Sequence, residues 1–268
     1  MSETTLQEAI DCFIRHQQTH DFRQSAVADA CFDALAEYLQ HHSDLFRDEE
    51  EEGPDMLHWE QDLQDHMEHL LEGDVEQTPD LGTLKCTDFA AGHLSDFIGW
   101  FMLRMQTSDE SIIGDYCACL RAWLNFMNKR HWLAPGAHTE FMGTLVELEP
   151  ESLRAARAAQ LLLHYVRMGR GVSASLREHR FSSFREGHAR ITELLKKQMW
   201  LQFDGQDSCI GPVLLAKEIV SVLRPGDVLD IELGLRGDTW LIVDIGPVYP
   251  QAVYVEAEEI ELAENILY

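Results

Sequence analysis

The chain has 268 residues, of which 45 % are hydrophobic and 25 % are charged. This composition is typical of a folded globular protein and excludes the collagen-like, disulfide-scaffold and intrinsically disordered classes. Its 47 acidic residues outnumber its 21 basic residues and give a formal net charge of −26. Such a charge repels nucleic-acid phosphates and anionic membrane surfaces at long range.

The cysteines and the N-terminal segment indicate a compartment. Six cysteines lie at positions 12, 31, 86, 117, 119 and 209, without the spacing of a disulfide framework. The segment MSETTLQEAIDC has neither a basic nor an apolar leader region, and no later run has the length of a membrane span. We expect a cytoplasmic protein with reduced thiols and no membrane partner.

Hydrophobic periodicity predicts a mainly α protein with a small C-terminal β unit. Helical spacing predicts helices over 8–17, 25–46, 57–71, 87–104, 108–131, 150–168 and 182–199. From Trp200 the period changes to two, and short strands are expected over 201–203, 213–215, 228–233, 239–245 and 252–255. These strands suit a small β-barrel of SH3-like size.

Charge divides the same chain into three regions. Residues 1–140 hold 8 basic and 28 acidic residues, whereas residues 151–200 hold 10 basic and 4 acidic residues. We therefore expect an acidic helical bundle over 1–140, a basic helical connector over 141–199 and the β-barrel over 200–268.

The N-terminal half resembles a known DNA-binding module. Between Leu6 and Trp132 the matching text is FDALAEYLQHHSDLF, LKCTDFAAGHLSDFIGWFMLRM and TSDESIIGDYCACLRAWLNFMNKRHWL. Its order of helices and capped helix starts is similar to the SAM-like core-binding domain of tyrosine recombinases (phage integrases). The resemblance implies a SAM-like helical bundle that, in that family, holds DNA with basic side chains.

The chain departs from that family in chemistry. One recombinase-like motif, His164-x-x-Arg167, follows the module by about 30 residues, too few to hold the catalytic domain before it. Acidic residues at 29, 33, 37 and 44 also stand where a DNA clamp needs lysine or arginine. We therefore expect the fold without recombinase activity.

One helix face is a candidate metal site. His58, Asp62, His66 and His69 are spaced by 4, 4 and 3 residues, which places all four on one side of a helix. A divalent metal is the cofactor that such a face holds. The alternative is a solvated face in a histidine-rich acidic chain, and no other cofactor is expected.

The basic segment is a candidate contact for phosphates or for a partner. Clustered arginines offer paired donors to phosphate oxygens. The alternative is that the segment pairs with the acidic half of the chain, within one molecule or across a homo-oligomer. The segment also carries Arg185, and its contact candidates are Arg154, Arg157, Arg167, Arg170, Arg177, Arg180, Arg190, Lys196 and Lys197.

Two further sets of residues complete the candidates. Trp240, Tyr249 and Tyr254 in the β unit form a candidate peptide groove, with a core role for Trp240 as the alternative. Cys117 and Cys119 point about 200° apart on a helix and cannot chelate one ion, so a buried structural role is expected for them and for Cys31.

The leading functional expectation is a non-catalytic interaction or adaptor protein with an acidic helical docking surface and a protein partner. The second is a DNA-associated accessory or regulatory protein that contacts phosphates through residues 154–197. The third is a metal-binding protein.

Overall fold

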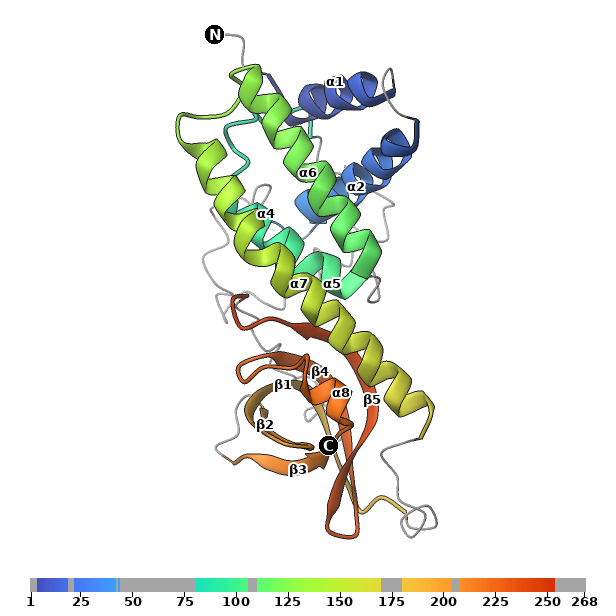
Figure 1. The fold of residues 1–268 in the computed structure, drawn as a ribbon. Helices are drawn as coiled ribbons and strands as arrows, with labels where there is room; N and C mark the ends of the chain where they lie inside the picture. The colour runs from blue at the N-terminus through green and yellow to red at the C-terminus, as the bar shows by residue number, and fades with distance from the viewer. Residues whose placement is uncertain are drawn as a thin grey trace, which may run out of the picture.

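The computed structural model describes residues 4–18, 22–41, 43, 81–105, 110–169, 180–203 and 208–253. A helical unit precedes a β unit, and one long helix runs from the first to the second (Figure 1). This confirms the prediction of an α unit followed along the chain by a small β unit. Among these residues, no helix combines the length and apolar character that crossing a membrane requires.

The described helices agree with most of the predicted ones. The prediction over 57–71 lies outside the described residues. The helices are α1 (Leu6–Gln18), α2 (Phe22–His41), α4 (Ala91–Asp96), the π-turn η1 (Phe97–Phe101), α5 (Met102–Met105), α6 (Glu110–Lys129), α7 (Ala137–Arg167) and α8 (Lys217–Val220).

Aromatic side chains form much of the core of the helical unit. Phe32 of α2 meets the fully buried Trp123 of α6 edge to face, with ring centroids 5.2 Å apart. Phe89 stacks on Phe141 of α7 at 5.2 Å. Such contacts add packing energy to the burial of large apolar rings, so α2, α6 and α7 share one core.

The π-turn η1 interrupts one continuous helical stretch from Ala91 to Met105. A π-turn widens the helix and leaves its carbonyls with altered partners. Ser152 of α7 donates its hydroxyl to the carbonyl of Ile98 at 3.2 Å, in a buried position. An ideal Cβ at Gly99 would lie 2.2 Å from Val253, so glycine permits the chain after the last strand to pack against this turn.

Helix α7 starts earlier than the sequence pattern predicts. The predicted start at Pro150 is wrong, because α7 runs unbroken from Ala137 to Arg167 with Pro150 inside it. A proline in a helix removes one N–H and leaves the carbonyl four residues earlier without its partner. That carbonyl belongs to Val146, which is 70 % exposed, so water reaches it.

The five strands close into a barrel in the order β1-β2-β3-β5-β4. The pairs are antiparallel except that β3 runs parallel to β5, with Val213 opposite Trp240. The strands are β1 (Ser183–Leu195), β2 (Gln198–Phe203), β3 (Ile210–Leu214), β4 (Val228–Arg236) and β5 (Thr239–Tyr249).

The predicted helix over 182–199 is wrong. The predicted connector over 141–199 is therefore not helical in this part. The segment forms β1 and the start of β2. Strand β1 pairs with β4 over Ser183–Arg190 and with β2 over Ala189–Leu195. Its buried residues, Ala189 and Ile191, alternate with less buried neighbours because they face the barrel interior.

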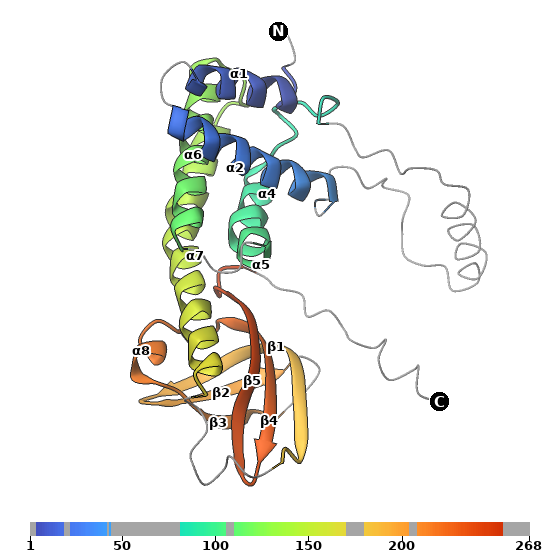
Figure 2. The ribbon, with the colours of Figure 1, turned by 90° about the vertical axis from the view of Figure 1, so that its right-hand side faces the viewer.

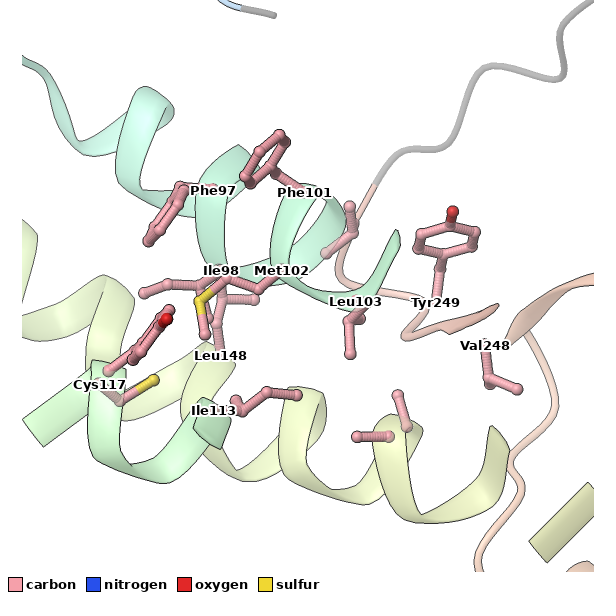
Figure 3. Close-up of a cluster of buried hydrophobic side chains, with 14 of the residues drawn as sticks. Phe97, Ile98, Phe101, Met102, Leu103, Ile113, Cys117, Leu148, Val248 and Tyr249 are labelled. Carbon is pink, nitrogen blue, oxygen red and sulfur yellow. The ribbon is translucent and has the colours of Figure 1, made fainter. Parts of the chain in front are cut away.

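Helix α7 packs against the barrel along β5 (Figure 2). Tyr165, near the end of α7, donates its hydroxyl to the carbonyl of Leu214 at 3.0 Å. At the end of β5 nearer the helical unit, the buried Val248 and Tyr249 lie beside Leu103 of α5 (Figure 3). Apolar burial thus continues from the helical unit into the β unit.

Candidate functional site

A network of ions links α7 to the loop before β4. Arg154 donates to both carboxylate oxygens of Asp227 at 2.8 Å each. It also donates to Glu151 at 2.9 and 3.1 Å and to the carbonyl of Val222 at 2.9 Å. Arg224 binds the other oxygen of Glu151 and donates its backbone N–H to Asp227 at 2.8 Å.

This network uses the hydrogen-bonding capacity of Arg154 completely. A guanidinium has five N–H donors, and the five bonds above account for one on Nε and two on each terminal nitrogen. Burial disfavours the charged form, but hydrogen bonds and charge from Asp227 and then Glu151 outweigh it and raise the pKa of Arg154 above its usual value. All five donors of Arg154 are therefore occupied within the chain, which fits the intramolecular pairing given as the alternative to a phosphate contact.

The remaining basic candidates are spread over several elements. Arg157 and Arg167 are exposed on α7, and Arg180, Lys196 and Lys197 are exposed around β1. Arg190 of β1 donates to the carbonyl of Gly226 at 3.2 Å. Arg170 and Arg177 lie outside the described residues.

An open recess of about 430 Å³ lies beside the network, lined by Glu147, Glu151, Arg154, Arg224, Asp227, Gln251 and Ala252. Four of its charged lining residues are paired with one another, because Arg154 binds Glu151 and Asp227 and Arg224 binds Glu151. The role that this geometry supports is structural: it fixes α7 to the barrel.

The three residues predicted to form a peptide groove, Trp240, Tyr249 and Tyr254, differ in their surroundings. Tyr249 is 2 % exposed, and its ring meets His188 edge to face at 5.9 Å. Trp240 is half-buried and packs against the core, as the alternative reading expected. Tyr254 lies outside the described residues.

The predicted metal face, His58, Asp62, His66 and His69, also lies outside the described residues. Within the part of the chain that the structure describes, no three histidine, cysteine, aspartate or glutamate side chains gather where they could hold a metal ion.

The outer face of β2 and β3 is a candidate surface that the sequence reasoning missed. Met199, Leu201 and Phe203 point into the barrel, so Gln198, Trp200 and Gln202 lie on the outside of β2. The indole of Trp200 covers Gly211 of β3, where an ideal Cβ would lie 2.7 Å from its Cδ1. The strict alternation of QMWLQF was the signal that could have revealed this face.

In the part of the chain that the structure describes, the helices pack mainly on β5 rather than on this outer face, and Tyr165 of α7 reaches the carbonyl of Leu214 at the end of β3. Helices α5 and α7 pack on β5, and α7 also contacts α8. Beyond Trp200, the face presents the exposed Pro212 and Leu214 of β3. The exposed Lys196 and Lys197 form the turn between β1 and β2 at its edge.

Comparison with protein-family models, with curated proteins and with solved structures finds no match for this chain. The tyrosine-recombinase resemblance of the N-terminal half accordingly stays a prediction.

Proposed function

We propose that this chain is a non-catalytic cytoplasmic adaptor that holds two docking surfaces in a fixed relation. The observation that supports it most is the continuity of α7. This 31-residue helix packs on α6 at one end and on β5 at the other. The Arg154–Asp227 pair then fixes it to the barrel. A rigid link of this kind orients two surfaces and needs no reacting group.

The strand order supports the outer face of β2 and β3 as one docking surface. A closed 1-2-3-5-4 barrel with a parallel β3–β5 pair and a helix between β3 and β4 has the topology of the OB-fold. An SH3-like barrel, the form expected from the sequence, is an antiparallel meander. OB-fold barrels bind oligonucleotides and oligosaccharides across β2 and β3 and the neighbouring loops, so this face is the one where we expect a partner of the barrel to dock. The acidic helical bundle, whose SAM-like identity stays a prediction, is the second surface.

Photo-crosslinking tests the first surface. A photoreactive amino acid replaces Gln198, on the outer face of β2, in the full-length protein. A matched control replaces the exposed Arg157 on α7. We expect a discrete protein adduct from position 198 that disappears in the Trp200→Ala background. Identical adducts from both positions, or an adduct that is indifferent to Trp200, would refute this surface.

A second candidate is single-stranded nucleic acid on the same face. Trp200 beside Lys196 and Lys197 combines a partly exposed ring with two phosphate-binding cations. Proteins that bind single strands stack bases on aromatic rings and follow the backbone with positive charge. This candidate narrows the predicted phosphate contact from residues 154–197 to the β1–β2 turn.

Fluorescence anisotropy with labelled single-stranded and duplex DNA, over a salt series, tests the second candidate. Two phosphate contacts on a single strand predict a log–log salt slope of about −1.4. The double variant Lys196→Ala, Lys197→Ala removes that slope. Absence of single-strand binding at low salt rules out this candidate and leaves the protein partner.

A further inference from the structure

A cavity of about 450 Å³ lies where α1, α2 and α6 meet. One water molecule occupies about 30 Å³ in the liquid, so the space admits small solutes. Cys119 of α6 places its thiol on the wall. The other lining residues are Phe13, Gln17, Val27, Ala28, Asp115, Ala118 and Ala122. Cys119 is partly exposed, and a small reagent therefore reaches it from this cavity.

A second thiol lies directly behind Cys119. Cys31 of α2 is fully buried, and its Sγ lies 3.9 Å from the carbonyl oxygen of Tyr116 on α6. Tyr116 and Cys119 are three residues apart and share one face of α6. Val27 and Ala28, which line the cavity together with Cys119, lie one turn before Cys31 on the same face of α2. Two thiols from neighbouring helices therefore meet, and one of them borders the cavity.

The environment of this pair favours a neutral product over a charged one. Burial, followed by the neighbouring Cys119, raises the pKa of Cys31 well above its usual value. Two ionised thiols side by side would keep negative charge in this buried place, which is costly. A disulfide carries no charge. Within the described residues no third side chain completes a metal site here.

We propose that Cys31 and Cys119 are a peroxide-sensitive thiol pair that forms a disulfide between α2 and α6. The Cys119 thiolate attacks one oxygen of hydrogen peroxide, the O–O bond breaks, and a sulfenic acid and hydroxide result. The sulfur of Cys31, whose proton passes to the hydroxide, then attacks the sulfur of Cys119. The S–S bond forms, the S–O bond breaks, and the released hydroxide becomes water with the proton that Cys119 gave up. Two thiols are oxidised and one peroxide is reduced to two waters. Reversible disulfides of this kind occur in reducing compartments as redox sensors.

Peptide mapping of the peroxide-treated full-length protein tests this pair. The reaction is stopped with an alkylating reagent, and the protein is digested without reduction and analysed by mass spectrometry. We expect a Cys31–Cys119 linked peptide, two hydrogen atoms lighter than its parts, and a fall from six free thiols to four. Dithiothreitol reverses both changes. The linked protein unfolds at a higher temperature, because the cross-link restricts the unfolded chain.

Variants separate the pair from ordinary cysteine oxidation. In Cys31→Ala, Cys119 stops at the sulfenic acid, which dimedone traps. In Cys119→Ser, Cys31 stays reduced. Cys209→Ser, at an exposed cysteine of the barrel, leaves the linked peptide unchanged. A peroxide-treated wild-type protein in which Cys119 is over-oxidised while Cys31 is unmodified overturns the proposal, and so does one linked through other cysteines. Both results come from the wild-type chain and do not depend on how the variants fold.

Discussion

Replacing Asp227 with alanine should destabilise the protein strongly. Asp227 is 0 % exposed, and Arg154, its main partner, has a side chain that is only 12 % exposed. The substitution removes two hydrogen bonds from Arg154 and one from the backbone of Arg224. It also leaves a cation largely out of water with Glu151 as its remaining ionic partner. Removing one member of a buried pair costs about 3–5 kcal/mol. Because Glu151 remains, we expect about 3 kcal/mol.

Urea unfolding followed by far-ultraviolet circular dichroism measures this loss. Asp227→Asn, which keeps the size and one acceptor oxygen, should lose an intermediate amount. Arg157→Ala is the matched control, since Arg157 is exposed on the same helix one turn later, and it should change the free energy of unfolding by less than about 0.5 kcal/mol. If Asp227→Ala costs no more than this control, the network does not fix α7 to the barrel.

Three further substitutions test the packing and the electrostatics. Gly99→Ala places a Cβ 2.2 Å from Val253 and should cost about 1–3 kcal/mol of stability by overpacking, so the thermal midpoint should fall. Gly92→Ala is the control, because a Cβ at Gly92 meets no atom within 4 Å, and its midpoint should not fall. Equal midpoints for the two variants contradict the contact between Gly99 and Val253. Burial raises the pKa of Cys117 from 9.0 to about 12. The Cys117 thiol therefore ionises at a lower pH in the unfolded chain than in the folded protein. The free energy of unfolding then falls as pH rises from 9 towards 12, by at most about 1.4 kcal/mol per pH unit. Cys117→Ala should flatten this fall in unfolding curves measured between pH 8 and pH 10.5, and parallel curves refute it. Tyr165→Phe removes a 3.0 Å hydrogen bond to β3 and should cost about 1 kcal/mol in urea, whereas an unchanged midpoint shows that this bond does not contribute.

Local periodicity was sufficient wherever burial follows from one element alone. The helix over 108–131 and the strands over 228–233 and 239–245 were predicted, and the structure has α6, β4 and β5 there. In each, apolar residues repeat at the period of the element that buries them. The same rule failed over 182–199, where the arginines, glutamates and leucines favour a helix. In the structure Gly187 has a φ of 124°, which is not helical. Strand β1 instead pairs with β2 along one edge and with β4 along the other, as closure of the barrel requires.

The sequence by itself determined the order of an acidic helical part and a β part, because composition and periodicity are properties of neighbouring residues. Only the tertiary structure decided what the charged and thiol residues do. Arg154 and Asp227 are 73 positions apart, and no local pattern shows that one neutralises the other. Cys31 and Cys119 likewise belong to separate helices. Whether a polar group is available to a ligand depends on its partners, and long-range packing chooses those partners.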